Sequence, residues 1–294
     1  MFDLIDWLNM GQKLNDMIYG SMECSAVIGA LLENETLKRL AGIHQSGAVF
    51  LVEPRIKHTR LEHSIGVCML IRLLGGTELE QIAGLLHDLS HTAFSHVGDY
   101  VYGCQNEDFH EQQFENILLN SEIPQVLDQF GYNVEQILHG TFGILERELP
   151  DLCADRLDYT LRDAIYAGII RRTEALQFLS VLTIRDQRIV VPSEIHANWI
   201  NHVFKQLNAQ FFNDPVNLYA NHQLAKIIKL QLEDGRLKDE DLFKDDVFVL
   251  NKIRSSSDGL ASINSIKKKE GLAAVLKKSN LVIKKRVLNV SAVS

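Results

Sequence analysis

The chain has 294 residues, of which 46% are hydrophobic and 23% are charged, and its formal net charge is −8. Such a chain can bury a sizeable core, in one large domain or two small ones. No run approaches the roughly 20 apolar residues of a membrane span, the N-terminus is acidic where a secretory signal is basic, and the four cysteines form no CxxC pair, so we predict a cytoplasmic protein with no membrane segment.

Apolar residues recur at helical spacing through most of the chain, which predicts a mostly α fold. Residues 21–45 predict two short helices, and residues 48–54 predict an extended segment that stops at its proline. We expect a helix over 59–74 and a second over 78–89. Thr77 and Glu80 predict a capping box at the start of the second helix.

The second half of the chain continues this pattern. Shorter helices are expected near 92–103, 108–119 and 134–139, and a long one over 151–169. Residues 181–191 predict one small β hairpin, because two β-branched runs flank Arg-Asp-Gln. A long helical segment follows over 193–232, broken before Pro215. Strands and helices do not alternate regularly and no glycine-rich phosphate loop is present, which argues against Rossmann and P-loop folds.

The C-terminal part differs in charge from the rest. Residues 1–251 carry 20 basic and 36 acidic side chains, whereas residues 252–294 carry 10 basic and 2 acidic ones. With a linker at 255–259, we predict a core at 1–254 and a basic tail at 255–294. The stretch 260–294 either attracts a polyanion such as nucleic acid, or is a solvated helix face, or contacts the acidic body of the same or another copy.

Four side chains have the character of metal ligands: His63, the adjacent pair His87 and Asp88, and Asp155. Neighbouring residues on a helix diverge by about 100°, so one ion can meet all four only if His63 and Asp155 come from other helices. Any single histidine is more often a satisfied core or surface residue. The whole set, however, suits a divalent cation that acts on oxygen, and therefore indicates hydrolysis at phosphorus.

The sequence around these residues resembles the HD-domain phosphohydrolase superfamily. The resemblance rests on His63-Ser-Ile-Gly-Val, Gly-Leu-Leu-His87-Asp88-Leu-Ser-His91 and Ala-Asp155-Arg-Leu-Asp-Tyr159, and covers roughly 13–250. It is closest to the branch that hydrolyses deoxynucleoside triphosphates (dNTPs). It implies an HD-domain helical bundle with one small β hairpin, a divalent metal cofactor (Mn, Fe, Ni, Zn or Mg), a nucleotide substrate and assembly into homo-oligomers.

The resemblance also implies roles for individual residues. The metal ligands would be His63, His87, Asp88 and Asp155. The residues near the phosphates that carry acid and base chemistry would be His91, His96, Asp99, His110 and Glu111. The residues that bind phosphate and sugar would be Gln45, Arg60, Arg156, Tyr159, Asp163 and Tyr219. A histidine held by a carboxylate suits a general acid near neutral pH, either His96 or His110, with Asp99 or Glu111 to orient it.

The chain departs from that branch at the substrate site. Ser46 stands where an apolar residue helps to exclude a ribose hydroxyl, and 208–218 contain no basic side chain where a phosphate-binding arginine is expected. The sequence therefore predicts a metal-dependent phosphohydrolase acting on nucleotides. The most specific form of this prediction is conversion of dNTP to deoxynucleoside plus triphosphate. A phosphodiesterase, nuclease or nucleotide monophosphatase with the same ion is the alternative. A second alternative is a non-catalytic module that binds nucleotide or nucleic acid.

Overall fold

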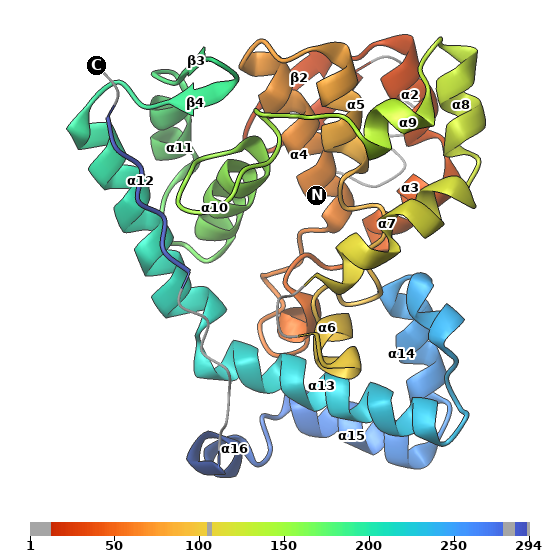
Figure 1. Cartoon of the computed structure of the whole chain (residues 1–294). Helices are drawn as coiled ribbons and strands as arrows, with labels where there is room; N and C mark the ends of the chain where they lie inside the picture. The colour runs from red at the N-terminus through yellow and green to blue at the C-terminus, as the bar shows by residue number, and fades with distance from the viewer. Residues whose placement is uncertain (1–12, 105–107, 279–285, 293–294) are drawn as a thin grey trace.

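The computed structural model describes residues 13–104, 108–278 and 286–292, and its fold is mostly α, as predicted (Figure 1). The helices of the first half are α2 (Ala26–Leu32), α3 (Glu35–Lys38), α4 (Arg60–Leu73), α5 (Glu78–Leu86), α6 (Val97–Tyr102), α7 (Phe109–Leu119), α8 (Ile123–Gln129) and α9 (Val134–Leu138). Those of the second half are α10 (Ala154–Tyr166), α11 (Arg172–Leu179), α12 (Glu194–Leu207), α13 (Pro215–Glu233), α14 (Asp246–Arg254), α15 (Ser257–Lys267) and α16 (Leu272–Lys278).

Two hydrophobic cores organise these helices. The larger is built on α4, which packs against α5 and α10. The smaller is built on α13, which packs against α6, α14 and α15 (Figure 1). No helix in the part of the chain that the structure describes is both long and apolar enough to cross a bilayer.

Helix α4 begins where its sequence predicts, because Thr59 and Glu62 form a capping box. The capping box predicted for α5 is only half formed. Thr77 accepts from the Glu80 backbone N–H at 3.2 Å, but the Glu80 carboxylate turns away and accepts the backbone N–H groups of Ile144 and Leu145 at 2.7 and 3.2 Å. Glu80 thus fixes the loop that leads into α10.

The hairpin predicted at 181–191 is present, as β3 (Thr183–Arg185) paired antiparallel with β4 (Arg188–Val190). Asp186 and Gln187 both have positive φ, as a two-residue type I′ turn requires. A second antiparallel hairpin joins β1 (Lys13–Asp16) to β2 (Gly20–Glu23), with Lys13 opposite Glu23. The sequence did not predict it, since both strands are short and contain no β-branched residue.

The extended segment predicted at 48–54 is wrong, because the chain there forms a short 3-10 helix, η2 (Gly47–Leu51). Tertiary contacts decide this conformation. The Ala48 N–H donates to Asn221 Oδ1 at 2.7 Å, and a Cβ at Gly47 would lie 2.6 Å from that oxygen. Gly47 has φ +67°, so the close approach and the backbone both require glycine.

The predicted break before Pro215 is confirmed. Helix α12 ends at Leu207, a π-helical turn η3 (Asn208–Phe212) follows, and Asp214 caps α13. The linker expected at 255–259 is instead the start of α15, where Ser256 accepts from the Gly259 N–H. Two further 3-10 turns complete the described structure, η1 (Arg39–Gly42) and η4 (Asp239–Phe243). The division of the chain after residue 254 stays a prediction.

Candidate active site

Three of the four predicted metal ligands converge. His63 projects from α4, His87 follows α5, and Asp155 lies in the first turn of α10. One ligand atom from each lies within 4.8 Å of the other two, so this group could hold a metal ion. His63 Nε2 is 3.0 Å from Asp155 Oδ1, and His87 Nε2 is 3.5 Å from the same oxygen.

The two imidazoles are oriented for a cation. His63 Nδ1 lies 2.7 Å from Asp158 Oδ2, and His87 Nδ1 lies 2.8 Å from the Gly84 carbonyl oxygen, so each Nδ1 donates and leaves an Nε2 lone pair for the shared space. His87 Nε2 is buried without a hydrogen-bond partner among the described residues. An unsatisfied buried acceptor beside a carboxylate fits a bound divalent ion.

Without an ion, His63 strongly favours a proton at this position. Burial by itself disfavours the imidazolium, but the hydrogen bonds to Asp155 and Asp158 outweigh it and raise the pKa of His63 to about 10. The pKa of Asp155 is lowered, because its bonds to His63 and His87 outweigh the burial that opposes its charge. The site is therefore built to hold positive charge, and a cation would take the place of the proton.

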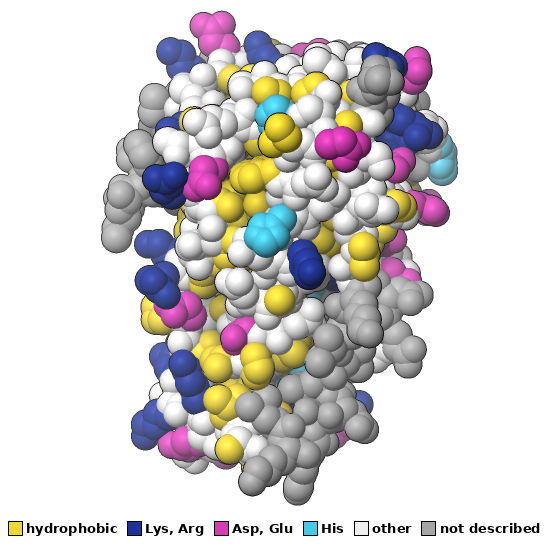
Figure 2. Space-filling model, turned by 90° about the vertical axis from the view of Figure 1, so that its left-hand side faces the viewer, with side chains coloured by type: hydrophobic (Ala, Val, Ile, Leu, Met, Phe, Trp, Pro, Cys, Tyr) yellow, Lys and Arg dark blue, Asp and Glu magenta, His cyan; other side chains and the backbone are white. Residues whose placement is uncertain are grey.

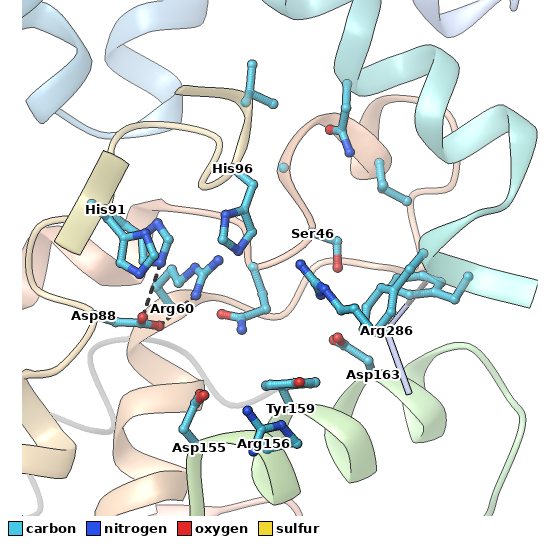
Figure 3. A pocket seen from close by; sticks show the side chains of 18 of the residues that line it. Ser46, Arg60, Asp88, His91, His96, Asp155, Arg156, Tyr159, Asp163 and Arg286 are labelled. Carbon is cyan, nitrogen blue, oxygen red and sulfur yellow. Dashed lines mark hydrogen bonds and ion pairs between the residues drawn. The ribbon is translucent and has the colours of Figure 1, made fainter. Parts of the chain in front are cut away.

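The fourth predicted ligand, Asp88, lies beside this group and also contacts Arg60 and His91. Its carboxylate oxygens lie 3.7 Å from His63 Nε2 and 3.5 Å from His87 Nε2. Asp88 Oδ2 also accepts from Arg60 Nη1 at 2.8 Å, and Oδ1 lies 3.2 Å from His91 Nε2 (Figure 3). Arg60 is held in turn by Ser95 Oγ, which accepts from its Nε at 2.9 Å.

A buried chain of charges supports His63 from behind. Arg162 makes two 2.8 Å bonds to Asp158 and one of 2.8 Å to Asp16. Arg162 and, after it, His63 hold the pKa of the Asp158 carboxyl at about 2, despite burial that opposes its charge. Gly66 on α4 leaves the room for this pairing, because a Cβ there would lie 2.1 Å from Arg162 Nη2.

A pocket of about 370 Å³ opens in front of these groups, a size within the range of small-molecule sites. Twelve of the fifteen predicted site residues line it: Gln45, Arg60, His87, Asp88, His91, His96, His110, Glu111, Asp155, Arg156, Tyr159 and Asp163. His63 and Asp99 are not on its wall but hold residues that are. Tyr219 is not brought to the pocket: it is buried in the smaller core, where its hydroxyl donates to the Glu270 carbonyl at 2.7 Å.

Three histidines cluster on the side of the pocket near Asp88. The rings of His91 and His110 stack at 3.9 Å, and His96 meets both edge-on. Burial lowers the pKa of each, that of His110 to about 4, so all three are neutral at neutral pH without a ligand. Their ligand atoms also lie within 4.8 Å of one another, as a second group that could hold an ion.

Within this cluster, His96 is the histidine that a carboxylate orients. Its Nδ1 lies 2.9 Å from Asp99 Oδ2, while Asp99 Oδ1 accepts from the Phe109 N–H at 3.1 Å. This leaves His96 Nε2 for the pocket. Glu111 lies exposed on the pocket's rim.

The other predicted substrate residues lie around the pocket (Figure 3). Gln45 Oε1 is buried without a hydrogen-bond partner among the described residues, and so is Ser46 Oγ. Asp163 Oδ1 lies 2.5 Å from His58 Nε2, so His58 fixes that carboxylate. Arg156 directs both terminal nitrogens to the Arg147 carbonyl, at 3.0 Å each.

Sequence reasoning missed several residues that shape the site. The spacing of Asp158 and Arg162, four apart on one helix, was a visible signal for their ion pair. His58 had no signal beyond its place among six histidines in 58–110. Arg286, which also lines the pocket, was seen only as part of a basic stretch.

Comparisons with known proteins agree with this geometry. Residues 60–176 match the family described as "HD domain". The Bacillus subtilis protein YdhJ is 45% identical over 84% of this chain and 76% of its own length. The "Metal-dependent phosphohydrolase cns2" of Cordyceps militaris is 31% identical over 79% of this chain and 69% of its own. A crystal structure of a hypothetical protein from Aquifex aeolicus, 24% identical, shares the fold with a TM-score of 0.69 over 88% of this chain and 75% of that one.

Two more distant relatives carry a substrate in their names. Human "Deoxynucleoside triphosphate triphosphohydrolase SAMHD1" is 25% identical over 78% of this chain, and a SAMHD1 homolog of Dictyostelium discoideum is 28% identical over 76%. This chain spans 44% and 48% of the lengths of these two proteins.

Proposed function

The chain belongs to the HD-domain family of metal-dependent phosphohydrolases, and from this premise we propose that it hydrolyses dNTPs to deoxynucleosides and triphosphate. The observation that carries the proposal is one pocket bordered by a cation-binding group, by Arg60 and by a carboxylate-held histidine. The names of the two SAMHD1-type relatives support the dNTP as substrate.

His63, His87 and Asp155 would hold the divalent cation, with Asp88 beside them. When bound, such an ion activates water and polarises a phosphoryl oxygen. The part of Arg60 is to hold Asp88 in place and to present a charged donor to the phosphate nearest the sugar.

His96 is proposed as the general acid for the sugar oxygen that leaves. Asp99 fixes its Nδ1, so Nε2 is the nitrogen that can carry a proton to the leaving group. The pKa of His96 is lowered by burial in the free protein. A triphosphate carries about four negative charges, and negative charge nearby raises the pKa of an imidazole, so we infer that His96 takes up its proton together with the substrate.

The sugar side of the pocket supports a nucleotide substrate. Gln45 Oε1 and Ser46 Oγ are buried polar atoms in need of partners, and sugar hydroxyls or a base could supply them. Asp163, whose carboxylate is held by His58, is proposed to accept a hydrogen bond from the 3′-hydroxyl. Ser46 is small and polar, and this observation favours acceptance of ribonucleotides beside dNTPs. Tyr219 as a sugar-binding residue stays a prediction that the smaller core does not support.

Other phosphoesters form the second candidate, a phosphodiesterase, nuclease or nucleotide monophosphatase with the same cation. The observation in its favour is the absence of basic side chains from 208–218, which form one pocket wall. Attraction of nucleic acid to 260–294 and self-assembly stay hypotheses. Figure 2 shows Lys and Arg mixed with Asp and Glu on the described atoms of one face, whereas a nucleic-acid groove presents a surface of one sign.

A nucleotide panel with Mn²⁺ tests the proposal. We expect release of triphosphate from dNTPs and loss of turnover in Asp155→Asn. Arg55→Gln, which changes an exposed surface arginine, is the control and should match the wild type. Orthophosphate from monophosphates, or shortening of labelled oligonucleotides, would instead select the second candidate. Undiminished turnover in Asp155→Asn would refute the metal mechanism.

A further inference from the structure

The C-terminal segment 286–292 lies along α12 (Figure 1), and its first residue, Arg286, lines the pocket. Side-chain amides of α12 and η3 hold its backbone. Asn201 exchanges two hydrogen bonds of 2.9 Å with the Val290 backbone, and Asn208 Nδ2 donates to the Arg286 carbonyl at 3.1 Å. Leu288 is buried in the larger core. The register of the segment is therefore specified, and Arg286 is the residue that it brings to the pocket.

The Arg286 side chain points into the pocket between Ser46 and Asp163 (Figure 3). Its guanidinium lies 5.7 Å from the centre of the Phe212 ring, on the wall formed by η3. The lining residues that come from 208–221 are neutral, namely Asn208, Phe211, Phe212, Asn213, Asn217, Leu218 and Asn221. Among the described residues, Arg286 therefore supplies a positive charge beside the neutral wall that 208–221 form.

The electrostatics of the pocket favour an anion between two of its arginines, Arg60 and Arg286. Burial lowers the pKa of the Arg286 guanidinium, and the charge of Arg60 across the pocket lowers it further. Two arginines facing one desolvated space repel each other, and a polyanion between them would reverse that cost.

We propose that Arg286 is a substrate-binding residue that contacts the phosphate chain of the nucleotide, and that docking of segment 286–292 on α12 completes the pocket. The inference rests on the proposed function, because it assigns Arg286 to the phosphates of that substrate. It gives the basic tail a role within its own chain. It also supplies the basic group that 208–218 lack.

The test compares Arg286→Gln, Arg286→Lys and the surface control Arg55→Gln in the full-length, Mn²⁺-loaded protein. Loss of one charge-assisted contact to phosphate should raise KM for dNTP roughly 10- to 100-fold and change kcat less. The Kd for inorganic tripolyphosphate should rise by a similar factor, while the Kd for the deoxynucleoside stays unchanged. Arg286→Lys should keep part of the affinity, since lysine keeps the positive charge but lacks the forked N–H donors of the guanidinium. Arg55→Gln should match the wild type.

A third variant tests the docking. Asn201→Ala removes both hydrogen bonds to Val290, and Asn201 is not among the residues that line the pocket, so this variant should also raise KM, by a smaller factor. An unchanged KM in Asn201→Ala would refute the role of docking.

The role of Arg286 is overturned if Arg286→Gln keeps the wild-type KM and tripolyphosphate Kd. It is equally overturned if tripolyphosphate and deoxynucleoside weaken together, because that pattern marks a general disturbance of the pocket. A wild-type protein that hydrolyses no dNTP would instead end the proposed function, and tripolyphosphate binding would still decide whether Arg286 holds phosphate.

Discussion

Gly66 is the position where one added carbon should disturb both fold and site. It lies on α4 against the Asp158–Arg162 pair. A Cβ there would lie 2.1 Å from Arg162 Nη2 and 2.3 Å from Asp158 Oδ1. Since carbon contacts are comfortable near roughly 3.5 Å, both atoms must retreat by about 1 Å or more. They are buried and held by bonds of 2.8 Å, so the retreat breaks the pairing.

The expected change in the free energy of unfolding is the sum of two contributions. Breaking a buried ion pair costs about 3 to 5 kcal/mol, while replacing a helical glycine by alanine returns about 0.5 to 1 kcal/mol. We therefore expect Gly66→Ala to lower the free energy of unfolding by roughly 3 kcal/mol. Asp158 also accepts from His63 Nδ1, so metal affinity should fall roughly 10- to 100-fold.

Urea unfolding of the metal-free protein measures the first effect, and calorimetric titration with Mn²⁺ measures the second. Gly29→Ala on α2 is the matched control, because its Cβ would meet nothing closer than Cys24 Sγ at 3.8 Å. It should leave stability equal or slightly higher. A Gly66→Ala protein that unfolds within about 1 kcal/mol of the wild type and binds Mn²⁺ equally would show that this ion pair does not support the metal site.

Four further outcomes are expected. His96→Gln should lower kcat for dNTP roughly 100- to 10,000-fold with little change in KM. A rise in KM with an unchanged kcat would count against the role of His96 as an acid. Removal of metal by a chelator should abolish turnover and lower the thermal midpoint, and Mn²⁺ at about 100 times its Kd should restore about 2.7 kcal/mol of stability; a midpoint that ignores Mn²⁺ would contradict the site. His110 has its pKa lowered to about 4 from 6.5, so the unfolded chain binds its proton first and stability should fall as pH drops through that window. His110→Gln should flatten this fall in urea titrations, and an identical slope would remove His110 as its source. If the tail attracts nucleic acid, replacing the exposed Lys267, Lys268 and Lys269 by glutamine should reduce the salt dependence of binding by about 2 to 3 in log–log slope, and an unchanged slope would reject that hypothesis.

The nucleic-acid hypothesis is tested by substituting these lysines, because deletion of the tail from residue 260 would also remove a part of the fold. Ile263 and Ile266 of α15 are fully buried in the smaller core. Their burial was not visible in the charge count, which grouped them with a basic tail. Charge composition describes a surface, whereas burial depends on which helix face meets α13.

Local sequence decided much of the fold. Thr59 and Glu62 start α4, Pro215 starts α13 after a break, and two β-branched runs pair as β3 and β4. These signals work because caps, prolines and turns act within a few residues of themselves. The prediction for residues 48–54 failed for the opposite reason, because their conformation depends on Asn221, more than 160 positions away.

The candidate site divides in the same way. The residue types and spacing of His63, His87, Asp88 and Asp155 were enough to expect a cation, since metal chemistry restricts the choice of ligands. Tertiary structure alone joined Asp16 to Arg162, His58 to Asp163, and Arg286 to the pocket. Such contacts join side chains from distant parts of the chain, and no local periodicity encodes which of them will meet. They are decided when the helices pack and leave each buried charge the partner that it needs.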